Sequence, residues 1–258
     1  MKQLLLLVKR DVKKTLSLRT WLIWGAMAAF CIFFFYTSSG RRDLMEQGKV
    51  QFMSLMIAQM MFGTWAVLSV FFDIVSGDRQ HNVLDCILCS GVAKGRVILS
   101  KILAMMLVSM VLVVIYLLPV TVVIVVQSGN TGFFSLFTQY FFALWAFIMV
   151  FAAIGLTISV LARSSKAALI LSLAAGLLLM PRFFMILVEA ASSLLGWGEA
   201  VQGMVNMLSP GILLDALSDF SNGARFVQAV VYLAVSILGF GIAAAAVFCR
   251  QDELNYGE

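Results

Sequence analysis

Charge and histidine are scarce in this chain of 258 residues. Charged residues make up 12% of it, hydrophobic residues make up 62%, and His81 is its one histidine. A typical soluble domain has about 25% charged residues, so this composition excludes an ordinary soluble protein and favours a chain that lies in lipid. A single histidine also excludes most histidine-based catalytic triads and the H-E-x-x-H zinc site within this chain.

A nucleotide-binding loop is also missing. The chain has no G-x-x-x-x-G-K-[ST], and residues 91–96 do not have its spacing. Six membrane helices of about 20 residues each, with their loops, account for almost the whole length. We therefore predict one membrane domain over residues 1–258, without a catalytic, metal or cofactor site, whose energy source lies on another subunit.

The four cysteines do not form the framework of a secreted disulfide-rich protein. Cys86 and Cys89 form a C-x-x-C, and His81 precedes them by five residues. A metal or redox site is one interpretation of this group, but a second C-x-x-C is missing and three ligands make an incomplete zinc set. The net charge of +5 is spread between apolar runs, which indicates membrane topology rather than nucleic-acid binding.

Six apolar runs are long enough to cross a bilayer. Backbone N–H and C=O groups cannot stay unpaired in hydrocarbon, and no run alternates with the period of two that a membrane barrel requires, so all six are expected to be helices. The predicted fold is an all-α polytopic membrane protein with spans near 21–36, 52–75, 102–126, 134–161, 167–188 and 226–248.

The lysines and arginines predict the orientation. With six spans, the segments on the side of the two termini hold thirteen of these residues, and the other side holds Arg41, Arg42, Lys49, Arg182 and Arg225. Because cytoplasmic loops carry the excess of Lys and Arg, both termini are expected in the cytoplasm.

Residues 1–19 predict an amphipathic helix before the first span. Leu5, Val8, Val12 and Leu16 recur at helical spacing, and basic residues occupy the other faces. Such a helix fits the inner membrane surface, where its cations meet anionic headgroups. A solvated basic helix that only follows the charge rule is the alternative.

The polar segment 76–101 carries the main functional signal. A short helix near 78–90 would place Val83, Leu84, Ile87 and Leu88 on one stripe, and Ser90 with Gly91 would form a turn. An apolar stripe needs a partner, which is the membrane surface, other helices of the bundle or a groove on a cytoplasmic protein.

In this segment the sequence resembles the ABC-2-type permeases. Their pattern runs as an acidic residue, a Gly-Thr step, a Leu-Leu pair, a proline, a basic residue and a lysine at the third span. The chain departs from it at His81, Asn82 and Gly91. The residues that follow the pattern are Asp78, Val83 with Leu84, Ile87 with Leu88, Lys94 or Arg96, and Lys101.

The resemblance implies a cytoplasmic coupling helix that sits in a cleft of a separate nucleotide-binding subunit, which would hold the ATP and magnesium. The coupling residues would be Asp78, Arg79, Val83, Leu84, Ile87 and Leu88. It also implies a multi-pass protein of the bacterial plasma membrane that pairs with a second copy or a related permease. A loop helix that merely packs on its own bundle is the alternative.

The outer side carries a second candidate site. Pro181 should kink or end the fifth span, and Arg182 and Glu189 would share one helical face seven residues apart. They are a candidate pathway or outer-gate pair; the alternative is an arginine that reaches the outer headgroups. Within the outer segment 189–225, glycines, Pro210 and apolar residues predict short re-entrant helices, as in the permease family.

The predicted function is the permease half of an ATP-driven exporter. An amphipathic or antimicrobial peptide is the favoured cargo because the spans are rich in Met and Phe, and lipids, drugs, haem or an immunity role stay open. One rival is a membrane scaffold or sensor that moves no cargo. Another is a membrane enzyme, for which Asp73 and Asp78 are the one close acidic pair at the inner edge.

Overall fold

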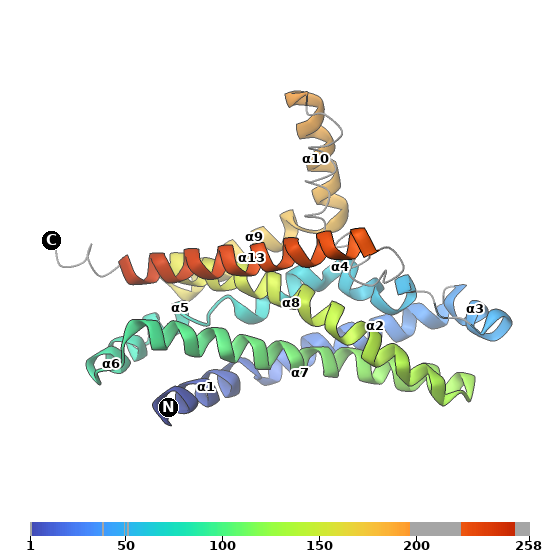
Figure 1. The fold of residues 1–258 in the computed structure, drawn as a ribbon, viewed down its shortest axis with the longest axis horizontal. Coiled ribbons are helices and arrows are strands. Elements are labelled where there is room, and N and C mark those ends of the chain that lie inside the picture. Colours follow the sequence, from blue (N-terminus) through green and yellow to red (C-terminus); the bar gives the residue numbers. More distant parts are fainter. Residues whose placement is uncertain (1, 38, 49, 51, 197–222, 251–258) are drawn as a thin grey trace.

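The computed structural model describes residues 2–37, 39–48, 50, 52–196 and 223–250, and within these it is helical, without strands. The long helices lie side by side in an elongated bundle, and α10 leaves it at a steep angle (Figure 1). The helices are α1 (Lys2–Thr15), α2 (Leu18–Thr37), α3 (Ser39–Gln47), α4 (Phe52–Phe71), α5 (Ser76–Gln80), α6 (Val83–Cys89), α7 (Lys94–Ser128), the 3₁₀ turn η1 (Thr131–Phe133), α8 (Phe134–Leu161), α9 (Ser165–Leu178), α10 (Pro181–Leu195) and α13 (Gly223–Arg250).

Five helical segments in the described part are long and apolar enough to cross a membrane: Leu18–Thr37, Ser54–Gln80, Lys94–Ser128, Thr131–Leu161 and Phe226–Arg250. The predicted all-α polytopic fold is confirmed. The helix α1 and the C-terminal end of α13 lie at the end of the bundle that carries α5 and α6 (Figure 1).

The predicted fifth span, 167–188, is two helices rather than one. Met180 has an extended backbone, with φ −60° and ψ 134°, as expected for a residue that precedes proline, and Pro181 opens α10. Of the kink or end expected at Pro181, the structure shows an end, and α9 has only 14 residues, about 21 Å at 1.5 Å per residue. That is shorter than the hydrocarbon core of about 30 Å.

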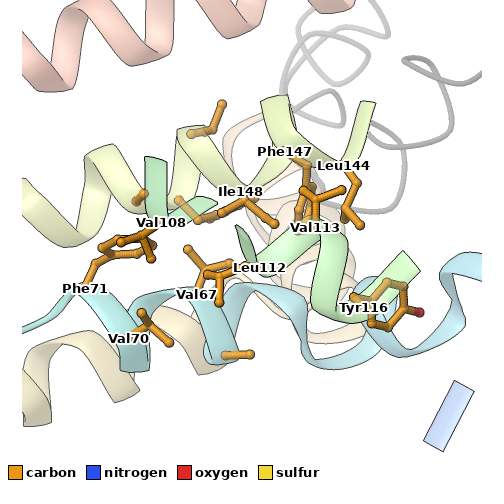
Figure 2. Close-up of a cluster of buried hydrophobic side chains, with 14 of the residues drawn as sticks. Val67, Val70, Phe71, Val108, Leu112, Val113, Tyr116, Leu144, Phe147 and Ile148 are labelled. Carbon is orange, nitrogen blue, oxygen red and sulfur yellow. The ribbon is translucent and has the colours of Figure 1, made fainter. Parts of the chain in front are cut away.

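The core of the bundle lies between α4, α7 and α8. Valine, leucine and phenylalanine side chains from the three helices pack together there (Figure 2). Tyr116 donates a hydrogen bond to the carbonyl of Leu55 at 2.8 Å. The helix α2 packs on α4 and α7, and α13 packs along α8. Only 17% of the most apolar 18-residue stretch of α13 is buried, so most of this helix faces lipid or another protein.

The contact between α9 and α4 depends on Gly176. A Cβ atom at this glycine would lie 3.0 Å from the Cα of Trp65, which is backbone and has little room to move. We expect Gly176→Ala to destabilise the fold by about 1–3 kcal/mol because it overpacks this contact. Thermal unfolding in mild detergent measures the change. Gly25→Ala in α2, where no atom lies within 4 Å, is the matched control and should be neutral or slightly stabilising; equal melting temperatures for both variants would contradict the close contact.

Candidate coupling site at one end of the bundle

The segment after α4 forms two short helices, so the predicted helix 78–90 is wrong in its bounds. The helix α5 ends at Gln80, and α6 starts at Val83. Between them Asn82 has a left-handed backbone with φ 55°, a conformation that asparagine tolerates better than most residues and that interrupts the helix.

The start of α5 is fixed by α8. The backbone N–H groups of Val75 and Ser76 both donate to the hydroxyl oxygen of Ser159, at 2.9 and 3.0 Å. N–H groups at a helix start have no partner inside their own helix, so this hydroxyl satisfies groups that would otherwise be unpaired. The position of α5 is therefore set by a side chain more than eighty residues away in sequence.

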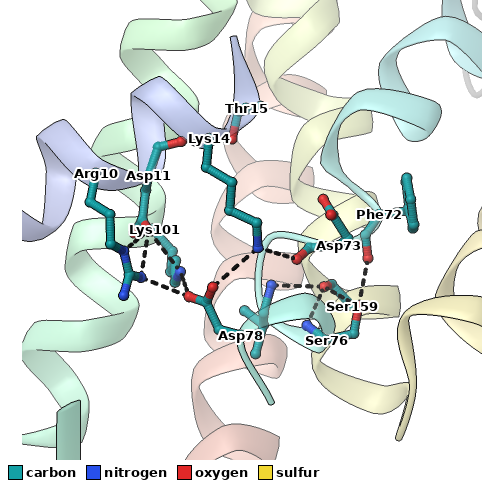
Figure 3. A network of polar contacts seen from close by, with 11 residues as sticks. Arg10, Asp11, Lys14, Thr15, Phe72, Asp73, Ser76, Asp78, Lys101 and Ser159 are labelled. Carbon is teal, nitrogen blue, oxygen red and sulfur yellow. Dashed lines mark hydrogen bonds and ion pairs between the residues drawn. The ribbon is translucent and has the colours of Figure 1, made fainter. Parts of the chain in front are cut away.

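Asp78 is the centre of a cluster of ions, which we call the Asp78 cluster: Arg10, Asp11, Lys14, Asp78 and Lys101. The Asp78 side chain is 5% exposed and accepts hydrogen bonds from Arg10 at 2.7 Å, Lys14 at 3.1 Å and Lys101 (Figure 3). The three cations come from α1 and α7, so one carboxylate of α5 ties three helices together.

Asp11 completes the cluster on the side of α1. Its Oδ1 accepts from the Arg10 guanidinium at 2.6 Å and from Lys101 Nζ at 3.1 Å, and its Oδ2 is buried without a partner among the described residues. Lys101 and Asp11 are each 1% exposed. The cluster holds three positive and two negative charges, so each buried carboxylate faces more than one cation.

The charges in the cluster reinforce one another. Burial disfavours the charged form of Arg10, but Asp11 and Asp78 outweigh it and raise the pKa of the guanidinium above its ordinary value. Lys14 also donates to the carbonyl oxygen of Asp73 at 3.1 Å. A Cβ at Gly77 would lie 2.9 Å from Lys14 Nζ, so the absence of a side chain at Gly77 leaves room for the Lys14 ammonium group.

Arg79 and Gln80 join α5 to the end of α8. The Arg79 guanidinium donates to the carbonyls of Val160 and Ala162, at 3.4 and 3.2 Å, and the Gln80 side-chain oxygen accepts from the Ser165 N–H at 3.0 Å. Carbonyls at a helix C-terminus lack partners within the helix, which makes them good acceptors for arginine. Residues 78–80 thus connect α5 with α1, α7, α8 and the start of α9.

The apolar stripe of α6 faces the bundle. Leu84 is buried in the core, and Ile87 and Leu88 are half-buried and pack against it. The alternative, in which the loop helix packs only on its own bundle, explains why Leu84 and Asp78 are buried. Ile87 and Leu88 keep part of their surface open, and Val83 is also half-exposed.

The second candidate pair lies apart from this site. Arg182 and Glu189 are both on α10, and Glu189 is exposed. The side chain of Arg182 is outside the described part, so the pairing stays a prediction. The re-entrant helices predicted within 189–225 fall on α10 up to Leu195 and otherwise mainly on residues 197–222, which lie outside the described residues.

No metal site emerges from the described residues: they contain no group of three or more His, Cys, Asp and Glu side chains that could hold an ion. Asp78 is enclosed by three cations from other helices, an arrangement that suits a structural role rather than an acid–base pair with Asp73. Cys86 and Cys89 are both exposed on α6.

Sequence reasoning did not find the partners of Asp78. Asp11 is the one acid among the basic residues 9–14, and it shares a helical face with the buried Val8 and Thr15. An acidic residue on the inward stripe of a basic helix is the signal that could have indicated a buried ion pair. Lys101 belongs to the permease pattern, but the pattern does not indicate that it pairs with Asp78, the acidic residue of the same pattern.

The described part of the chain is a polytopic helical bundle with a small multi-helix junction at one end. Residues 5–252 match the family described as ABC-2 family transporter protein, so the chain belongs to this family. It is a membrane permease of an ABC transporter, as its resemblance to that family implied. No curated protein matches the chain significantly.

We expect Asp78→Asn to destabilise the fold by about 3–5 kcal/mol, because it leaves Lys101 buried with one carboxylate fewer. Lys101→Met should cost less, since Asp78 keeps Arg10 and Lys14. Thermal unfolding in mild detergent ranks the variants. Asp85→Asn, at an exposed carboxylate of α6, is the control and should leave stability nearly unchanged. If the Asp78→Asn variant were as stable as Asp85→Asn, the cluster would not hold the junction together.

Proposed function

We propose that this chain is one half of an ATP-driven exporter, and that a separate ATPase subunit docks on α5 and α6. The observation that carries this proposal is the Asp78 cluster. A rigid-body motion delivered to α5 reaches the start of α7 through Lys101 and reaches α1 through Arg10 and Lys14. The junction therefore has the connections that a transmission element needs.

The docking surface is narrower than the sequence pattern suggested. Asp78, Arg79 and Leu84 hold the junction together from inside, while the open parts of Val83, Ile87 and Leu88 are available to a partner. The inner residues would set the stiffness of the joint, and the outer residues would supply the contact. ATP and magnesium would bind to the partner subunit.

The same geometry supports a proposal for the orientation and the assembly. The basic helix α1, the junction and the C-terminal end of α13 lie at one end of the bundle, which supports a cytoplasmic position for both termini in a bacterial plasma membrane (Figure 1). A second copy or a related permease would pair with this chain, so that cargo crosses between the two. The apolar faces that α2 and α13 leave open support such pairing.

We expect Ile87→Glu to abolish association with the ATPase subunit, because a carboxylate placed in an apolar contact loses its hydration. Purification of the tagged chain in mild detergent, with quantification of the co-purifying ATPase and its ATP hydrolysis, measures this. The control is Gln139→Glu, which adds a charge at an exposed position of α8 near the opposite end of the bundle. Equal ATPase recovery with both variants would refute the docking assignment.

For cargo, we propose an amphipathic peptide. An apolar groove between α2 and α4, lined by Ile23, Met27, Phe30, Phe62 and Trp65 among others, supports a hydrophobic or amphipathic substrate. Arg182 and Glu189 on α10 are proposed as an outer gate, which would be the last charged contact on the path.

We expect an amphipathic cationic peptide to stimulate ATP hydrolysis of the reconstituted complex and to accumulate inside inverted vesicles when ATP is added. The Ile87→Glu complex is the control and should show neither effect. Stimulation by a lipid, a drug or haem but not by peptide would overturn the cargo assignment. ATP hydrolysis without movement of any cargo would favour a scaffold or sensor.

A further inference from the structure

The two thiols of α6 are unlike the other cysteines of the chain. Cys86 and Cys89 are exposed, three residues apart on one short helix, whereas Cys31 is fully buried in the bundle and Cys249 is exposed by itself at the end of α13. Residues three apart on a helix are neighbours on its surface. The described fold uses neither thiol as a hydrogen-bonding or packing group, although both lie on the proposed docking element.

We propose that Cys86 and Cys89 form a reversible dithiol–disulfide pair that a low-molecular-weight disulfide oxidises. Helical geometry puts their Cα atoms about 5 Å apart. This separation lies inside the range of about 4.4–6.8 Å found in disulfides. Cys31 has no such neighbour and no access to the oxidant, and Cys249 has access without a partner, so the pair on α6 is chemically distinct.

The reaction is a two-step exchange. The thiolate of one cysteine attacks a sulfur of the small disulfide, whose S–S bond breaks and releases one small thiol, which leaves a mixed disulfide on α6. The second thiolate then attacks the protein sulfur of that mixed disulfide, forms the Cys86–Cys89 bond and releases the second small thiol. Two electrons pass from the protein to the oxidant, and the two protons of the protein thiols leave with the products.

Bond formation changes the shape of α6. In a regular helix the Cβ atoms of residues three apart are about 5–6 Å from each other. A disulfide brings them to about 3.5–4.5 Å, so the last turn must tighten by about 1–2 Å. That turn is closed by the bond from the Ser90 N–H to the Cys86 carbonyl, at 3.2 Å.

The deformation falls on the proposed docking contact. Ile87 and Leu88 are the two residues between the thiols, and their open surface is part of the proposed docking contact. Oxidation would therefore move both side chains and weaken binding of the ATPase subunit. This regulatory role rests on the proposed function, whereas formation of the disulfide does not.

The first test uses the full chain in mild detergent, equilibrated with mixtures of reduced and oxidised glutathione, then alkylated and analysed by mass spectrometry. We expect Cys86 and Cys89 to lose alkylation together and to yield one internal disulfide. Cys249 should form only a mixed disulfide with glutathione, and Cys31 should stay reduced. In Cys86→Ser, Cys89 should behave as Cys249 does. Absence of the internal disulfide in fully oxidised glutathione overturns the proposal.

The second test uses the complex with its ATPase subunit, with each variant compared with its own reduced state. Oxidation should lower ATPase binding about tenfold, equivalent to about 1.4 kcal/mol, and a dithiol reductant should restore it. Cys86→Ser and Cys89→Ser cannot form the internal disulfide, so the tenfold loss of ATPase binding should be absent in both variants. Unchanged binding in a chain whose disulfide has formed overturns the regulatory role. A reduced chain that binds no ATPase overturns the proposed function, and the regulatory role with it, but leaves the disulfide intact.

Discussion

The carboxylate of Asp78 is the constraint on which the end of this bundle depends. It is almost fully buried and is surrounded by cations from two other helices. A buried carboxylate is tolerated only with such partners, because the loss of hydration is costly. The same contacts that satisfy this charge also fix the relative positions of α1, α5 and α7. The proposed coupling role therefore grows out of a requirement of folding.

Most of the fold was predictable from the sequence because lipid leaves few choices. Backbone groups in hydrocarbon must be paired internally, so long apolar runs must be helices. A kink or an end of the fifth run at this point was also predictable, since a proline disfavours the helical conformation of the residue before it, here Met180. The division of that run into a short α9 and a separate α10 was harder to foresee, because hydropathy does not report the direction in which a chain continues.

The candidate site was predictable only in part. The apolar stripe of α6 and the acidic residue before it were visible, but helical spacing could not tell whether Leu84 faces the bundle or a partner. The break at Asn82 was missed because a single left-handed residue leaves a weak signal in sequence. The pairing of Asp78 with Lys101 and Arg10 joins segments that are 23 and 68 residues away, and such long-range contacts follow from packing rather than local pattern.

The helix α7 is long enough to connect the junction with the opposite end of the bundle. At 35 residues this helix is about 52 Å long, and it continues through Pro119, which has no N–H to give to the carbonyl of Ile115. A proline inside a helix is a common point of bending. Lys101 and Pro119 are about 27 Å apart along the helix axis. In the proposed coupling role, a tilt of α7 at Lys101 would be carried along the helix to Pro119, where the missing backbone hydrogen bond makes bending easiest.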